Sequence, residues 1–228
     1  MKLLFLGTGA ADWPIDLAQN AGKAEFRRMS SALVDDTLLI DPGPHAFAAM
    51  QTFGKDPAKV TYIINTHAHA DHFCPETLAQ FEALGAQFVR LTAGETVKLG
   101  DYTVSAYTAN HGTCAGAVHF LITDGTRTLF YGLDSAWLLY EEVQAIIKAK
   151  PQLVVLDATI GFIDGDYRVF EHNSLSMVLE MQKTLAPHVE RFCISHMART
   201  LHTDHQTLCA QMEPFGVIVA ADGLVVNI

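Results

Sequence analysis

The residues best suited to chemistry form one short run, His67-Ala68-His69-Ala70-Asp71-His72. Imidazole and carboxylate are ligands that borderline divalent metals such as Zn²⁺ accept. In an extended segment alternate side chains share a face, so we expect His67, His69 and Asp71 on one side and His72 on the other. Such a segment is able to serve two adjacent metal ions. The alternative is a polar loop that binds nothing, which clustering so many imidazoles without a partner disfavours.

This run resembles the signature of the metallo-β-lactamase-fold hydrolases. The segments Leu3-Leu4-Phe5-Leu6-Gly7-Thr8-Gly9 and Leu39-Ile40-Asp41-Pro42-Gly43 are similar to that family's first strands and turns, and the resemblance covers nearly the whole chain. It implies an α+β fold, a four-layer αβ/βα sandwich with a metal site along one edge, between the two sheets. We therefore expect a single hydrolase domain over residues 1–228.

The resemblance also implies the remaining metal ligands. His111 follows a strand-like segment, Asp134 ends the apolar run that begins at Leu129, and His196 ends the run that begins at Phe192. Taken alone, a solitary histidine after a strand is typical of a surface residue, and an aspartate there is typical of a turn. Here each lies just past a predicted strand, where loops from a rigid sheet converge. The implied sets are His67, His69, His111 and Asp134 on one metal, and Asp71, His72, Asp134 and His196 on the other.

The candidate ligands lie in a chain of alternating predicted strands and helices, and these elements must position them. No linker or repeat interrupts this alternation. The loop from Gly7 to Ser30 has no clear element, and loops of that length are often functional. Asn173 and Ser174 are typical caps for a helix start. Strands are predicted at 2–6, 31–34, 38–40, 61–65, 87–91, 103–109, 116–122, 128–131, 153–156, 191–194, 217–220 and 224–227. Helices are predicted at 44–53, 75–84, 138–149, 174–186 and 205–213.

A second carboxylate after a strand, Asp157, is followed by His172 at a helix start. This pattern resembles the family's phosphodiesterase branch, which includes the tRNA 3′-processing endonucleases and the phosphodiesterase of the carbon–phosphorus lyase pathway. The resemblance implies that His172 lies beside the scissile phosphate, where it stabilises charge or protonates the leaving oxygen, with Asp157 orienting it. A group that titrates near neutrality suits that role. The alternatives are a helix-cap neighbour facing water for His172 and a turn residue for Asp157.

The chain departs from that branch in two places. Residues Trp13 to Asn20 contain no cysteine, so the cysteine-rich structural zinc site of the carbon–phosphorus lyase enzyme is absent. The chain also has no room for the inserted arm with which the processing endonucleases grip tRNA. A small phosphodiester, such as a cyclic nucleotide or cyclic sugar phosphate, is the better expectation.

The composition and net charge of the chain limit the kinds of partner that we expect it to bind. The chain has 228 residues, half of them hydrophobic, and a formal net charge of −10. Proteins that track long nucleic acid rely on Lys and Arg contacts to phosphate, and the densest basic cluster here is only Lys23, Arg27 and Arg28. The apolar runs are far shorter than the roughly 20 residues of a membrane span, and no signal peptide is recognisable. We expect a cytoplasmic protein that binds a small anionic substrate, with no membrane partner and with a homodimer as the first assembly to test. Cys74, Cys114, Cys193 and Cys209 have no CxxC spacing and are expected to be reduced thiols.

The sequence thus predicts a dinuclear metal-dependent hydrolase that cleaves a small phosphodiester with a metal-bridging hydroxide. Two divalent metal ions are expected as cofactors, zinc first, with manganese and iron as alternatives. Asp71, Asp157 and His172 are the expected catalytic residues. One rival is a carboxylic ester, lactone or thioester hydrolase using the same metals. The other is a non-catalytic carrier of metal or of a small cofactor.

A few further residues stand near these motifs. Asp41 is expected to tie the neighbouring loop through hydrogen bonds. His45 and His205 are interpreted as surface residues. His202 is a loop residue, and the sequence does not decide whether it, His45, His205 or Arg28 reaches the active site.

Overall fold

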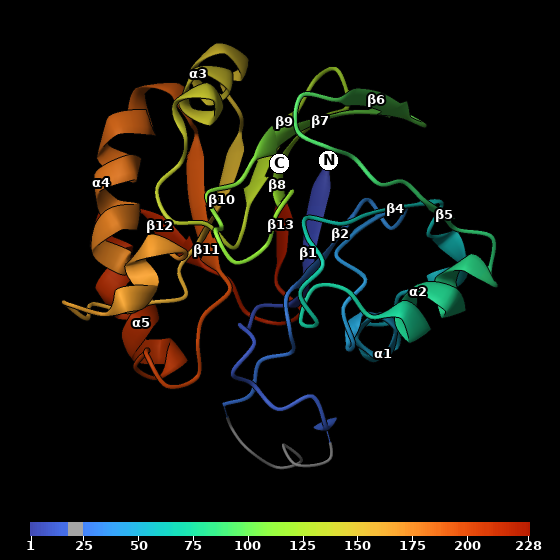
Figure 1. Cartoon of the computed structure of the whole chain (residues 1–228), viewed down its shortest axis with the longest axis horizontal. Coiled ribbons are helices and arrows are strands. Elements are labelled where there is room, and N and C mark those ends of the chain that lie inside the picture. Colours follow the sequence, from blue (N-terminus) through green and yellow to red (C-terminus); the bar gives the residue numbers. More distant parts are fainter. Residues whose placement is uncertain (18–24) are drawn as a thin grey trace. The chain divides into compact units, whose positions relative to one another are not determined.

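Two compact units make up the chain, and the computed structural model describes residues 1–17 and 25–228. The first unit comprises Met1–Arg90 with Ala220–Asn227, and the second comprises Leu91–Val219 with Ile228. The C-terminal segment therefore returns to the first unit, where its strand pairs with the first strand of the chain. Each unit is built on one mixed sheet (Figure 1).

The sheet of the first unit has the strand order β13-β1-β2-β3-β4-β5. Antiparallel pairing joins β13, β1, β2 and β3, whereas β3, β4 and β5 run parallel. Parallel neighbours need a crossover, and helices α1 and α2 lie in those two connections. The bounds are β1 Lys2–Gly7, β2 Ser31–Val34, β3 Leu38–Ile40, α1 Ala46–Thr52, β4 Tyr62–Ile64, α2 Pro75–Glu82, β5 Gln87–Phe88 and β13 Val225–Asn227.

Both helices of the first unit cover one face of its sheet. Met50 of α1 and Phe81 of α2 pack in one apolar cluster with Leu6, Leu39 and Ile63 of the strands. The strand residues that alternate with these are buried as well, so these strands are apolar on both faces. This explains why they appear in the sequence as continuous apolar runs.

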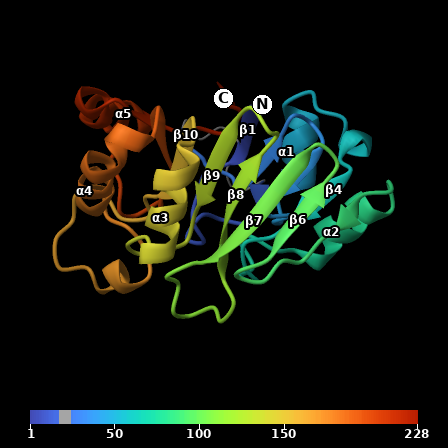
Figure 2. The ribbon, with the colours of Figure 1, turned by 90° about the horizontal axis from the view of Figure 1, so that it is seen from above.

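The sheet of the second unit has the order β12-β11-β10-β9-β8-β7-β6. Strands β9 to β12 run parallel, and β6 to β9 form an antiparallel meander, seen from above in Figure 2. The bounds are β6 Thr96–Leu99, β7 Tyr102–Thr108, β8 Val118–Thr123, β9 Thr128–Gly132, α3 Tyr140–Ala149, β10 Leu153–Asp157, α4 Leu175–Leu185, β11 Arg191–Ser195, α5 His205–Met212 and β12 Val217–Val219.

The core of the second unit lies between its parallel strands and three helices. Ile146 of α3, Val178 of α4 and Met212 of α5 pack with Leu156 and Ile194 of the strands. The predicted starts of α4 and α5 are confirmed to within one residue: the Ser174 side chain accepts a hydrogen bond from the Met177 amide, and Asp204 caps α5 in the same way. These caps satisfy amide groups that have no partner within their helix.

The predicted elements match the observed ones except at a few positions. Strand β6 was not predicted, because its sequence Thr-Val-Lys-Leu is short and half polar. The strand predicted at 87–91 is shorter, Gln87–Phe88. The helix predicted from Pro44 begins at Ala46, after a turn that Gly43 allows to approach the backbone of Asp71. Short 3₁₀ turns at Pro57–Lys59, Tyr167–Phe170, Ala186–His188 and Glu213–Phe215 were also not predicted.

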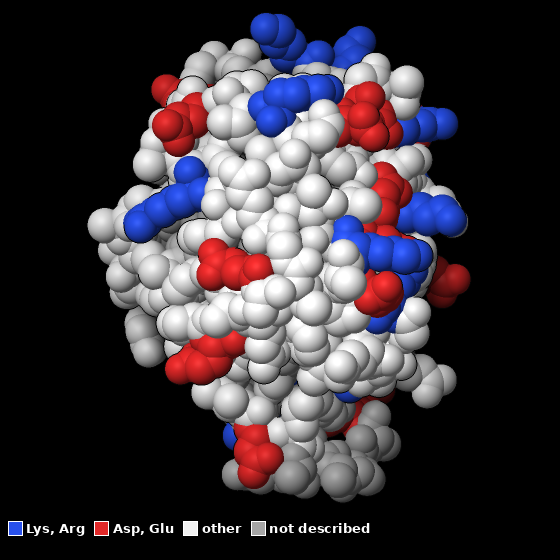
Figure 3. All heavy atoms as spheres, turned by 90° about the vertical axis from the view of Figure 1, so that its right-hand side faces the viewer, with Lys and Arg blue, Asp and Glu red and all other residues white. Residues whose placement is uncertain are grey.

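The surface and the helices bear on what the chain contacts. Among the described residues, no helix combines the length and the apolar character needed to cross a bilayer. On the face drawn in Figure 3, Lys and Arg side chains lie among Asp and Glu side chains. The four cysteines are free thiols.

Candidate metal centre

The histidine-rich run leaves β4 and then turns. The amides of His72 and Phe73 both donate to the His69 carbonyl, over 3.0 and 2.9 Å. The His67 ring centroid lies 4.6 Å from that of His69 and 4.4 Å from that of His72, and His72 Nε2 lies 3.5 Å from Asp71 Oδ2. The predicted extended arrangement, with His72 on the opposite face, is therefore wrong. Because the chain turns at this point, all four candidate ligands gather in one cluster of the first unit.

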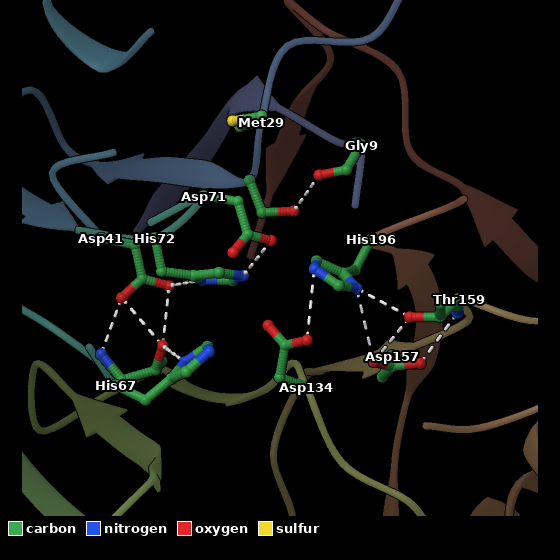
Figure 4. A network of polar contacts seen from close by, with 12 residues as sticks. Gly9, Met29, Asp41, His67, Asp71, His72, Asp134, Asp157, Thr159 and His196 are labelled. Atoms are coloured by element: carbon green, nitrogen blue, oxygen red, sulfur yellow. Dashed lines mark hydrogen bonds and ion pairs between the residues drawn. The ribbon is translucent and has the colours of Figure 1, made fainter. Parts of the chain in front are cut away.

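Asp41, directly after β3, holds this cluster in place (Figure 4). Its carboxylate is fully buried and accepts from the Thr66 amide (2.7 Å), the Asn65 side chain (3.0 Å) and His72 Nδ1 (2.7 Å). The Thr66 hydroxyl donates to Asp41 as well and accepts from His67 Nδ1 at 3.0 Å. The expectation that Asp41 ties the neighbouring loop is confirmed. Since both rings use Nδ1 for these bonds, Nε2 is the ring nitrogen that each could offer to a metal ion.

The second unit brings Asp134 and His196 together. Asp134 follows β9 and His196 follows β11, and their Oδ1 and Nε2 atoms lie 3.2 Å apart. Both residues are almost fully buried. The two atoms belong to one group of possible metal-binding atoms that also includes Asp157 and His172, all within 4.8 Å of one another.

Thr159 links these residues, and sequence reasoning missed it. Its hydroxyl accepts from His196 Nδ1 at 2.7 Å and donates to Asp157 Oδ2 at 3.0 Å (Figure 4). The Asp157 Oδ1 atom accepts from the amides of Thr159 and Asn173. The threonine hydroxyl, which both donates and accepts, thus fixes His196 with Nε2 turned towards Asp134. A threonine two residues after a strand aspartate was the available signal.

His172 lies against the same carboxylate. Its Nδ1 atom is 2.9 Å from Asp157 Oδ2 and 3.4 Å from Asp134 Oδ1, and its ring stacks on that of His196 at 5.6 Å. Burial opposes the charged imidazolium, but Asp157 outweighs that effect and raises the pKa of His172. Burial alone would raise the pKa of Asp157, but His172 and His196 hold it well below its usual range. The His172 side chain keeps 15% of its surface exposed, so it is not fully shielded from solvent.

His111 lies on the other side of His172. The two ring centroids are 5.2 Å apart, and His111 Nδ1 donates to the Glu171 carbonyl at 3.4 Å. The Glu171 carboxylate accepts from the Thr113 hydroxyl at 2.9 Å and joins both histidines in a second group of possible metal-binding atoms. Glu171 is therefore a further polar residue at this site that sequence reasoning did not select.

Three residues of the site have positive φ angles: Asp41 (60°), Asp134 (55°) and His196 (63°). Left-handed backbone is uncommon for residues other than glycine, and Asp and His are among those that adopt it most readily. Each of the three comes one or two residues after a strand end. The bend turns the side chain away from the strand direction, so the strand ends can aim these groups into the site.

Both units use the same device around their candidate ligands. In each, a buried aspartate and a threonine hydroxyl bind Nδ1 atoms of histidines, Asp41 with Thr66 in the first and Asp157 with Thr159 in the second. Histidines that bind metals characteristically donate their other ring nitrogen in this way, which fixes the tautomer. The donor set of imidazole and carboxylate therefore fits divalent metal ions.

Other candidate residues have structural roles. His45 is buried, not at the surface, because Nδ1 accepts from the Met29 amide and Nε2 donates to the Ile15 carbonyl. His202 donates to the Ala158 carbonyl at 2.6 Å, and His205 lies beside Cys209 on α5. The Arg28 amide donates to Asp222, and its guanidinium lies over Phe53. Lys23 of the predicted basic cluster lies outside the described residues.

Solved structures place this arrangement in a known fold. YhfI from Bacillus subtilis, a metallo-beta-lactamase fold protein, matches with a TM-score of 0.75 and 17% identity over 99% of this chain and 98% of its own. The chain has the metallo-beta-lactamase fold. Zinc-bound PqqB from Methylobacterium extorquens shares this fold (TM-score 0.74, 17% identity, 100% of both chains). So does the short form of human tRNase Z (TM-score 0.74, 17% identity, 100% of this chain and 99% of that one).

The sequence comparison agrees with the fold. The model of the metallo-beta-lactamase superfamily matches residues 30–74, a stretch that contains Asp41 and the whole run from His67 to His72. No curated protein sequence gives a significant match. The resemblance to the metallo-β-lactamase superfamily and the predicted α+β sandwich fold class are confirmed. The single-domain expectation stays a prediction.

Proposed function

We propose that this chain is a dinuclear metal-dependent hydrolase whose substrate is a small phosphodiester. The observation that carries the proposal is the Asp157–His172 pair, hydrogen-bonded at 2.9 Å directly beside Asp134 and His196. A histidine held in this way is suited to protonate a poor leaving group. That the same fold occurs in a tRNase Z and in a zinc-bound protein supports the proposal.

The candidate ligands divide into two proposed sets that share Asp134. We assign His67, His69, His111 and Asp134 to one metal ion, and Asp71, His72, Asp134 and His196 to the other. Each proposed set contains at least three protein ligands, as catalytic zinc sites do. Zinc is the first candidate, and manganese and iron accept the same ligands.

The remaining residues have separate roles. Two divalent cations, if bound by these residues, would supply a hydroxide nucleophile near neutral pH and would neutralise charge on the phosphate. Asp157 accepts a hydrogen bond from His172 Nδ1, which leaves Nε2 to face the substrate. As the phosphorus–oxygen bond breaks, the proton on Nε2 passes to the leaving oxygen, while the oxygen of water becomes bound to phosphorus. The freed hydroxyl and the phosphomonoester, which a cyclic substrate keeps in one molecule, together contain the atoms of the diester and one water.

The charge of the chain favours a small substrate. With a net charge of −10, the protein repels a long polyanion, whereas two divalent cations reverse the sign of the field locally. The described basic residues near the first loop, Arg27 and Arg28, bind groups of the protein itself. A cyclic nucleotide or cyclic sugar phosphate meets these conditions, and long nucleic acid does not.

A substrate panel with quantified metal tests this proposal. The protein is offered bis(p-nitrophenyl) phosphate, a cyclic nucleotide, a p-nitrophenyl carboxylic ester and a lactone, after its metal content has been measured. We expect two metal ions per chain and turnover of the diesters. Turnover of the ester or lactone alone would establish a carboxylic ester hydrolase instead, and two bound metals with no turnover would favour a carrier.

A further inference from the structure

A buried polar pair lies behind Asp134, outside the candidate ligand set. His119 of β8 is fully buried, and its Nε2 donates to the Leu133 carbonyl at 3.0 Å. Its Nδ1 is hydrogen-bonded to Glu142 of α3, which is also fully buried. The second oxygen of Glu142 accepts from the Leu139 amide at 2.7 Å, so the pair also fixes the start of α3. Burial opposes a charged His119, but Glu142 outweighs it and raises the pKa of His119.

The acceptor of the His119 bond is part of the backbone that shapes the site. The carbonyl of Leu133 belongs to the same peptide unit as the nitrogen of Asp134. The orientation of that unit determines φ of Asp134, which is 55°. In left-handed backbone Cβ approaches a neighbouring carbonyl oxygen too closely, so the surroundings must hold the conformation. The hydrogen bond from His119 fixes the peptide unit at this position.

Gly132 makes room for this contact. A Cβ atom on Gly132 would lie 2.7 Å from the Phe130 ring and 3.2 Å from His119 Nδ1. The absence of a side chain therefore lets the imidazole lie against the end of β9. From there it reaches the carbonyl of the next residue, Leu133.

We propose that His119, held by Glu142, is a positioning residue that fixes the Leu133–Asp134 peptide and so aims the Asp134 carboxylate at the metal ions. This inference rests on the proposed function. A buried ion pair is a weak source of stability, because apolar residues of similar volume often serve equally well. Apolar residues, however, cannot donate a hydrogen bond to the Leu133 carbonyl.

Three variants separate positioning from packing. Glu142→Gln keeps an acceptor for the Leu139 amide, offers a donor to His119 Nδ1 and removes the buried charge. The leucine double variant, Glu142→Gln with His119→Leu, lacks the donor to the Leu133 carbonyl. The glutamine double variant, Glu142→Gln with His119→Gln, places an amide N–H near the position of His119 Nε2 in the unaltered protein. Dissociation constants for Zn²⁺ are measured by competition with a chromogenic chelator, well below each melting temperature. The carbonyl ¹³C shift of Leu133 is measured in metal-free protein.

The leucine double variant is expected to bind zinc about 10- to 100-fold more weakly than Glu142→Gln, the usual cost of losing a group that orients a metal ligand. The glutamine double variant is expected to restore binding and the Leu133 shift. Equal zinc affinity in the two double variants, or an unchanged Leu133 shift in both, would overturn the inference even if one of them melts earlier. If the unaltered protein binds no divalent metal, the proposed function fails, and the Leu133 shift alone still decides whether His119 holds this peptide.

Discussion

Asp134→Asn is expected to lower kcat by about three orders of magnitude or more and to release bound metal. The bridging ligand in our assignment loses its charge, and metal ions contribute several kcal/mol of transition-state stabilisation, with each 1.4 kcal/mol worth a factor of about ten. Asparagine has the same shape as aspartate and tolerates left-handed backbone, so the fold should survive the change. Metal content by mass spectrometry and diester turnover measure the two effects.

The chain offers a matched control for this variant. Asp36 also has a positive φ, 64°, but lies in the turn between β2 and β3, where it pairs with Lys55 and is 40% exposed. Asp36→Asn is the same chemical change on the same backbone conformation, and an exposed ion pair contributes about 1 kcal/mol or less. We expect full metal content and full turnover in this control. An Asp134→Asn protein that behaved like the Asp36→Asn protein would refute the metal assignment.

His172→Ala is expected to lower kcat by about 10²- to 10⁴-fold on a diester with an alkoxide leaving group, with both metals retained. The alkoxide needs a proton as it departs, and His172 Nε2 is the group we assign to supply it. On bis(p-nitrophenyl) phosphate the loss should be much smaller, because p-nitrophenolate is stable without that proton. Parallel assays of the two diesters measure the difference.

The control removes an imidazole elsewhere. His188 lies in the 3₁₀ turn Ala186–His188, outside the candidate site, so His188→Ala should leave both activities unchanged. Asp157→Asn should resemble His172→Ala, because the carboxylate that orients the ring is lost. Equal losses on both diesters, or loss of metal from the His172→Ala protein, would contradict the acid role and leave His172 as a structural or ligand residue.

The elements and the ligand types were predictable because both depend on local sequence. Apolar runs of the length of β9 or β11 favour buried strands, and polar residues just after them fall where loops converge. The histidine-rich run could be recognised as a candidate metal-binding motif from the spacing of its own histidines and aspartate. Its turn at His69–His72 was not predictable, because Asp41 and Thr66 hold it through contacts with the end of another strand.

Residues that act through distant partners escaped prediction for the same reason. Thr159 is separated by 37 residues from His196, and His119 by 23 residues from Glu142. Nothing in local periodicity distinguishes Glu142 from an exposed helix residue, although it is fully buried. His45 was misinterpreted as a surface residue because its two backbone partners, Met29 and Ile15, lie 16 and 30 residues away in the sequence.

Crystals of metal-loaded protein would test the central claim most directly, through an anomalous difference map recorded at the absorption edge of the bound metal. The claim is that the proposed ligand sets hold two metal ions. We predict two peaks per chain. The first is contacted by His67, His69, His111 and Asp134, and the second by Asp71, His72, Asp134 and His196. A single peak, or two peaks that are not both contacted by Asp134, would contradict the dinuclear assignment.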